Sequence, residues 1–166
     1  MNGKGNKMVS TDQIMREQLL ALLRGGHAHM EFNQAVAGFP LEFINRKPPH
    51  VPYTPWHLLE HLRLAQWDIL EFIRNPNHIS PDWPTGYWPA SEAQADATQW
   101  QQTVTAFRAD LKALEELAAN PETDLFAPLP QGLPYTIFRE IMVVANHNSY
   151  HLGEFAILRQ VMNTWV

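Results

Sequence analysis

The stretch TPWHLLEHLRLAQWDILEFIRN, residues 54–75, carries the clearest helix signature in the chain. Thr54 is a preferred N-cap residue, and Pro55 stands at the first helical position, where its missing N–H leaves no hydrogen bond unmade. Apolar residues recur every three or four positions behind them and form one face, made of Leu58, Leu62, Ala65, Ile69 and Phe72. The stretch therefore predicts a long amphipathic helix that needs partners to cover this face.

Three further segments share the helical periodicity, and none of the chain alternates convincingly as a strand. By residue number these segments span 10–39, with a weak point at Gly25-Gly26, then 91–120, and 136 to about 164. The third helix is expected to start at Ser91, and Thr136 is expected to cap the fourth. Four such helices predict an all-α four-helix bundle. Long proline-rich connections before the second and fourth helices leave the order of the helices open at this point.

The composition describes one ordinary globular domain. The chain has 166 residues, of which 45% are hydrophobic and 17% charged, which is enough to bury a core without disulfides. We assign residues 10–166 to a single domain. Residues 1–9 are polar and are followed by no apolar run, so we expect a flexible N-terminal tail.

Charge and cysteine content exclude several classes of function. The net charge is −5 and no cluster of Lys and Arg is present, which argues against nucleic-acid binding. No cysteine is present, so disulfides, thiolate metal sites and cysteine nucleophiles are excluded. No window approaches the ~18 consecutive apolar residues that a membrane span needs. We therefore expect a cytoplasmic protein without a membrane partner, whose metal ligands would be His, Asp or Glu.

The stretch ANHNSYHLGEF, residues 145–155, places two histidines four residues apart. Side chains with this spacing lie about 40° apart on a helix. His147 and His151 therefore share one flank of the last helix with Glu154. The glutamate of the H-E-x-x-H metalloprotease motif is absent.

The 54–75 helix offers a third imidazole. His61 falls at the edge of the apolar face, whereas His57 points about 40° further toward solvent. His61 is therefore the better inward ligand, and His57 is the alternative. Three imidazoles from two helices would make a metal site of the kind found inside bundles. Spacing alone leaves open that the histidines are ordinary polar residues.

Two carboxylates accompany these histidines. Glu154 lies one turn beyond His151, and Asp68 is nearly aligned with His61 two turns later. Each is a candidate catalytic acid or base, or an acceptor for an imidazole N–H. Glu154 is also a candidate fourth ligand. The alternatives are a solvated glutamate and a polar residue at the core edge.

We expect the other polar and aromatic residues to have structural rather than functional roles. We expect Glu60 at the surface and Tyr150 as a packing residue, and we place Trp100 and Phe107 in the core. No convergent pattern involves the remaining histidines, His27, His29, His50 and His78.

The connection SPDWPTGYWP, residues 80–89, combines three prolines with Trp83, Tyr87 and Trp88. Such a stiff aromatic segment could cover the metal site or dock a partner subunit. The alternative, which we favour, is a loop folded over the bundle with its rings filling a gap.

The segments YTPWHLLEHLRLAQWDILEF and ANHNSYHLGEF together resemble the DinB/YfiT-like superfamily of metal-dependent four-helix proteins. Members carry a histidine in a W-x-x-x-x-H-L segment of the second helix, which matches Trp56 and His61-Leu62. They also carry H-x-x-x-H-L-G in the last helix, which matches His147 and His151 with Leu152-Gly153. The resemblance spans roughly residues 10–164. It implies an up-down-down-up bundle that holds one divalent metal ion through His61, His147 and His151.

The resemblance also implies a range of functions. Families of this kind include transferases that use low-molecular-weight thiols and a thiol-dependent isomerase. We therefore expect a metal-dependent hydrolase or thiol S-transferase that acts on a small-molecule substrate, and a homodimer. Zinc or nickel is favoured over iron or manganese, although imidazole sites accept several divalent metals.

Two rival functions stay open. One is a non-catalytic metal-binding or ligand-binding bundle, in which the site sequesters rather than reacts. The other is a dimerisation module whose histidines are incidental. Metal content would separate the enzyme and the metal-binding bundle, which both hold an ion, from the dimerisation module, which does not.

Overall fold

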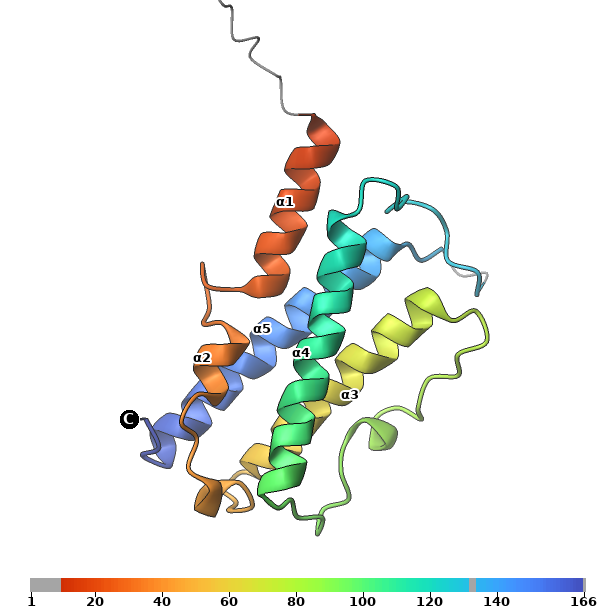
Figure 1. Cartoon of the computed structure of the whole chain (residues 1–166). Helices are drawn as coiled ribbons and strands as arrows, with labels where there is room; N and C mark the ends of the chain where they lie inside the picture. The colour runs from red at the N-terminus through yellow and green to blue at the C-terminus, as the bar shows by residue number, and fades with distance from the viewer. Residues whose placement is uncertain (1–9, 132–133, 166) are drawn as a thin grey trace, which may run out of the picture.

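The computed structural model describes residues 10–131 and 134–165 (Figure 1). Its four long helices are α1 (Thr11–Arg24), α3 (Pro55–Arg74), α4 (Ala97–Ala119) and α5 (Ile137–Val161). A short helix, α2 (Phe32–Val36), and two 3-10 turns, η1 (Leu41–Phe43) and η2 (Thr85–Tyr87), lie in the connections. Within the described ranges the only strand-like pairing is an isolated bridge between Pro128 and Thr136. The prediction of an all-α helical bundle is confirmed. The predicted tail, residues 1–9, and Val166 lie outside the described residues.

The side chain of Gln66 ties α3 to two neighbouring helices. Gln66 of α3 bonds to Asn148 of α5 and to the carbonyl of Phe107 in α4. Figure 1 shows α1 and α5 running one way, whereas α3 and α4 run the other way. α3 therefore lies parallel to α4 and antiparallel to α5. None of the described helices combines the length and the apolar character required to cross a membrane.

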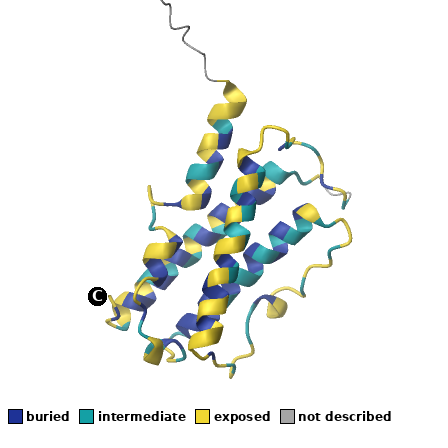
Figure 2. Cartoon of the chain, in the orientation of Figure 1, coloured by how far each residue is buried: buried dark blue, intermediate teal, exposed yellow. Residues whose placement is uncertain are grey.

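Two hydrophobic clusters fill the bundle, one toward each end. One gathers the start of α3, the start of α4 and the end of α5, and it contains Trp100 and Phe107, which are 6% and 0% exposed. The prediction that these two aromatic residues belong to the core is confirmed. The other cluster gathers the opposite halves of these helices together with α1. Figure 2 shows the buried residues on the faces that the helices turn toward one another.

Local capping explains where the helices begin and end. Thr54 caps α3 through the backbone N–H of His57, and Pro55 is its first residue, as predicted. α1 stops at Arg24 because Gly25 and Gly26 adopt φ of 74° and 84°, which lie outside the right-handed helical region. The predicted continuation of this helix shrinks to the five residues of α2.

The predicted start of the third helix at Ser91 is wrong. α4 begins at Ala97 and is capped by Asp96, whose side chain accepts from the N–H of Gln99 in a reciprocal capping box. The residue before the cap is pinned in a non-helical conformation, because Asn45 bonds both the N–H and the C=O of Ala95. The tertiary anchor of Ala95, directly before the cap, therefore moves the start of the helix by six residues.

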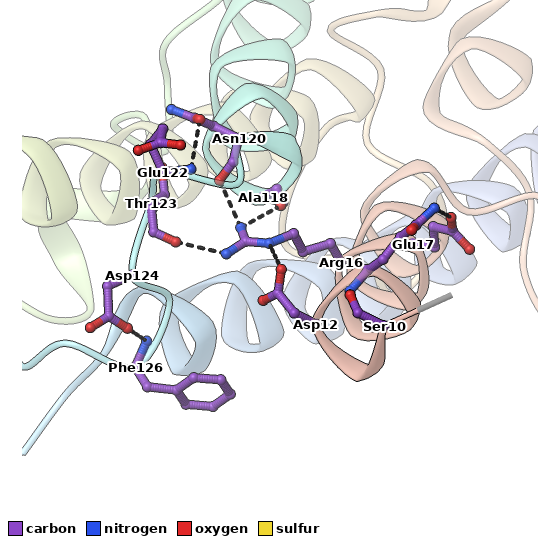
Figure 3. A network of polar contacts seen from close by, with 11 residues as sticks. Ser10, Asp12, Arg16, Glu17, Ala118, Asn120, Glu122, Thr123, Asp124 and Phe126 are labelled. Atoms are coloured by element: carbon purple, nitrogen blue, oxygen red, sulfur yellow. Dashed lines mark hydrogen bonds and ion pairs between the residues drawn. The ribbon is translucent and has the colours of Figure 1, made fainter. Parts of the chain in front are cut away.

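A buried arginine ties α1 to the end of α4 (Figure 3). Arg16 is 8% exposed, and its guanidinium donates to the carbonyls of Ala118, Asn120 and Thr123 at 3.1, 2.9 and 2.8 Å. Its Nε donates to Asp12 at 2.9 Å. The last carbonyls of a helix lack partners inside the helix, and a cation is favourable there. Arg16 thus donates hydrogen bonds to carbonyls at the C-terminal end of α4 and just beyond it.

Replacing Arg16 with methionine is expected to lower the free energy of unfolding by about 2–3 kcal/mol, because it leaves these carbonyls without their donor. Urea unfolding measures the loss. Arg24→Met is the matched control, since Arg24 is more exposed and makes a single ion pair with Glu115 at 3.0 Å; it is expected to cost less than about 1 kcal/mol. Equal costs for the two variants would contradict this role of Arg16.

Candidate metal centre

The antiparallel pairing of α3 and α5 brings three histidines together between the two hydrophobic clusters. His61 Nε2 lies 3.1 Å from His151 Nε2 and 3.2 Å from His147 Nε2. One ring nitrogen from each residue lies within 4.8 Å of the others. His61 is 2% exposed, whereas the two histidines of α5 are partly buried. The structure thus brings together the three histidines that the sequence pointed to.

The hydrogen bonds on the far side of two rings assign their tautomers. His61 Nδ1 lies 2.8 Å from the backbone carbonyl of Tyr87, and His151 Nδ1 lies 2.6 Å from Glu154 Oε2. Both partners are acceptors, so each Nδ1 carries a proton, and a neutral ring with its proton there has a lone pair on Nε2. Both Nε2 atoms then present lone pairs to each other across 3.1 Å. Facing lone pairs repel, and a cation between them removes the repulsion. This donor set fits a divalent metal ion.

Burial disfavours the charged forms of His147 and His61. Burial first, and then the charges of His151 and His61, lowers the pKa of His147 to about 3. Burial also lowers the pKa of His61, against the opposing hydrogen bond to the Tyr87 carbonyl. Metal ions bind the neutral imidazole, so neither of these two histidines has to lose a charge before it binds a metal ion at neutral pH.

Metal-free protein is expected to lose stability as the pH falls below about 6.5, the ordinary pKa of histidine. Between that value and the folded pKa of about 3, His147 takes up a proton only when the chain unfolds, so acid favours unfolding. The loss reaches about 1 kcal/mol near pH 5.5. Urea unfolding of wild type and His147→Gln at neutral pH and near pH 5.5 isolates this contribution. An identical pH dependence in both proteins would contradict it.

Glu154 sits on the outer side of His151. Its Oε2 accepts from His151 Nδ1, and its Oε1 accepts from the hydroxyl of Tyr53. Burial and this hydrogen bond raise the pKa of Tyr53, so the phenol stays protonated as the donor. Of the roles weighed for Glu154, the contacts match that of an acceptor for an imidazole N–H, because its carboxylate meets Nδ1 rather than the cluster of Nε2 atoms.

Asp68 makes no direct contact with His61. Its Oδ2 accepts from the hydroxyl of Tyr87 at 2.6 Å, and its Oδ1 lies 2.7 Å from His78 Nε2. The sequence assigned no role to His78. In the structure its side chain bonds to Asp68. Asp68 is therefore linked to the histidine cluster through Tyr87, in the segment between α3 and α4.

That connection also contributes directly to the cluster. The ring of Trp88 stacks on His61 at 3.9 Å between centroids and 5° between planes. Tyr87 is buried, whereas Trp83 is 75% exposed. The expectation that all three rings fill a gap is therefore wrong for Trp83. The contributions of Trp88 and of the Tyr87 carbonyl were missed, and a backbone carbonyl leaves no signature in a sequence.

Three smaller predictions around the site are wrong. His57 is 3% exposed, because the connection covers it and the Ala93 carbonyl lies 2.8 Å from its Nε2. Glu60 is not a free surface residue, since it bonds to Thr103 of α4 and pairs with Arg63. Tyr150 does not pack inside; it is 70% exposed, and its ring lies perpendicular to that of His151. Helical angles locate a side chain on its own helix, but they do not say what covers it.

A sequence model described as the DinB superfamily matches residues 15–155, a range that contains all three histidines, Asp68 and Glu154. No curated protein and no solved structure matches the chain.

Proposed function

The chain belongs to the DinB superfamily, and from this premise we propose that it is a metal-dependent enzyme whose single divalent ion is held by His61, His147 and His151. The observation that carries the proposal is the distance of 3.1 Å between Nε2 of His61 and Nε2 of His151, with an acceptor facing Nδ1 of each ring. No arrangement of protons on neutral rings in these tautomers satisfies both atoms. A cation does.

The proposed ligand set consists of imidazoles alone. Three protein ligands are typical of catalytic sites, which keep a position open, whereas structural zinc sites close with four. When bound, a zinc or nickel ion would supply Lewis acidity toward a water molecule or a low-molecular-weight thiol. The proposed reaction class is accordingly hydrolysis or thiol transfer on a small-molecule substrate.

The remaining residues of the site would orient the ligands. Glu154, held by the Tyr53 hydroxyl, fixes the tautomer of His151. The Tyr87 carbonyl does the same for His61, and the stacked Trp88 ring restricts its rotation. We therefore assign Glu154 and Asp68 to orientation rather than to proton transfer, because each carboxylate is already engaged by donors away from the Nε2 atoms.

The orientation of Glu154 and Asp68 favours a second candidate function. Both carboxylates are turned away from the Nε2 atoms, so neither is placed as an acid or base beside the proposed ion. A bundle that binds and sequesters a metal without turnover needs no such group, and it remains the alternative function.

One experiment separates the two functions. Zinc-loaded and nickel-loaded protein would be assayed against activated esters and amides and against electrophiles with several low-molecular-weight thiols. Wild type and His61→Ala would be compared. Turnover by loaded wild type alone supports the enzyme. Stoichiometric metal binding without turnover on any substrate favours sequestration, and a wild type that binds neither metal overturns both.

A further inference from the structure

Residues 78–88, here named the clamp segment, are fastened to α3 at Asp68. Asp68 is 6% exposed and receives two side chains of the segment, the hydroxyl of Tyr87 at 2.6 Å and Nε2 of His78 at 2.7 Å. Hydrogen bonds to a buried carboxylate are among the stronger ones in proteins. The two ends of the segment are thereby held on one residue.

The same segment touches His61, which lies two turns before Asp68 on α3. The Tyr87 carbonyl meets Nδ1 at 2.8 Å, and the Trp88 ring covers one face of the imidazole at 3.9 Å. A single residue, Tyr87, thus bonds to Asp68 with its side chain and to His61 with its backbone. Any movement that breaks one bond disturbs the other.

We propose that Asp68 and Tyr87 are positioning residues for His61, and that docking of the clamp segment and metal binding are thermodynamically coupled. The inference rests on the proposed metal site. When the segment is docked, His61 carries its proton on Nδ1 and offers Nε2 to the metal. When it is undocked, His61 loses this acceptor and the stacked ring, and both tautomers and several ring orientations become accessible.

The coupling has to act in both directions. Outer partners of metal-binding histidines typically change metal affinity by about 10–100-fold when removed. If the docked segment strengthens metal binding, then bound metal must stabilise the docked segment by the same factor. A loop without this coupling would be stabilised by the metal no more than the rest of the bundle is.

The test uses the full chain and compares Tyr87→Phe and Asp68→Asn with Tyr135→Phe. The control removes the same hydroxyl from a tyrosine that packs against Phe72, in the other hydrophobic cluster. Zn²⁺ affinity is measured by competition with a chromophoric chelator, and the Co²⁺-substituted proteins are compared by visible absorption. Hydrogen exchange of residues 78–88 is followed with and without Zn²⁺.

We expect Tyr87→Phe and Asp68→Asn to weaken Zn²⁺ binding by about 10-fold or more and to shift the Co²⁺ spectrum, with Tyr135→Phe within about twofold of wild type. Zn²⁺ should slow exchange in the clamp segment of wild type and slow it less in Tyr87→Phe. Unchanged affinity in a folded Tyr87→Phe, or exchange that ignores Zn²⁺ in a wild type that binds it, overturns the coupling alone. Failure of wild type to bind Zn²⁺ or Co²⁺ overturns the proposed metal site as well.

Discussion

Replacing His61 with alanine is expected to weaken Zn²⁺ binding by at least about a thousandfold, or ~4 kcal/mol. His61 Nε2 lies 3.1 Å from Nε2 of His151 and 3.2 Å from Nε2 of His147, so it faces both other imidazoles. Without it the site keeps only the two histidines of α5, and two imidazoles on one helix are a weak and poorly shaped donor set. Chelator competition measures the loss directly.

Thermal unfolding provides a second readout of this variant. A ligand present at about 1,000 times its Kd stabilises a protein by about 4 kcal/mol. For a domain of this size, that corresponds to a rise in Tm of roughly 8–16 °C. Saturating Zn²⁺ should therefore raise the Tm of wild type and leave that of His61→Ala almost unchanged.

The control for this variant is His57→Ala. His57 lies one turn earlier on α3, is buried, and bonds to the Ala93 carbonyl rather than to the cluster. It should lose stability with and without Zn²⁺ but keep the metal-dependent rise in Tm. A similar loss of metal response in both variants would mean that disturbance of α3, rather than removal of a ligand, explains the His61 result.

The second large effect is expected at Glu154. Glu154→Gln should weaken Zn²⁺ binding by about 10–100-fold, because the carboxylate that holds the Nδ1 proton of His151 is replaced by a neutral amide. The amide can also turn its NH₂ group toward Nδ1, which favours the tautomer that cannot bind metal through Nε2. Competition titration at several pH values measures the change.

Tyr53→Phe is the matched control for Glu154. It removes only the hydroxyl that donates to the other carboxylate oxygen and leaves the Glu154–His151 hydrogen bond in place. Its affinity should fall by less than that of Glu154→Gln. Wild-type affinity in Glu154→Gln would show that the tautomer of His151 does not depend on this carboxylate.

Local signals were sufficient for much of the fold. The boundaries of α3 follow from Thr54, Pro55 and Asn75, which act within a few residues of themselves. The start of α4 was misplaced because Ser91 is also an acceptable cap. The decisive difference is the contact of Asn45 with Ala95, which joins residues 50 positions apart.

The site shows a similar division. His147 and His151 share a face by helical geometry, and His61 joined them through its place at the edge of an apolar face. The groups that orient His61 could not be predicted from the sequence. The Tyr87 carbonyl and the Trp88 ring belong to an irregular connection, and the path of that connection depends on Asp68 and His78. The burial of Arg16 was equally hidden, since its partners are backbone carbonyls about 100 residues away.

The most direct test of the central claim is the metal content of purified wild type and His151→Ala, determined by elemental analysis without any immobilised-metal column. The proposed site predicts about one divalent ion per wild-type chain, either as purified or after incubation with Zn²⁺ or Ni²⁺, and almost none in the variant. Wild type that stays free of metal after that incubation, or a variant that binds as much as wild type, would contradict it.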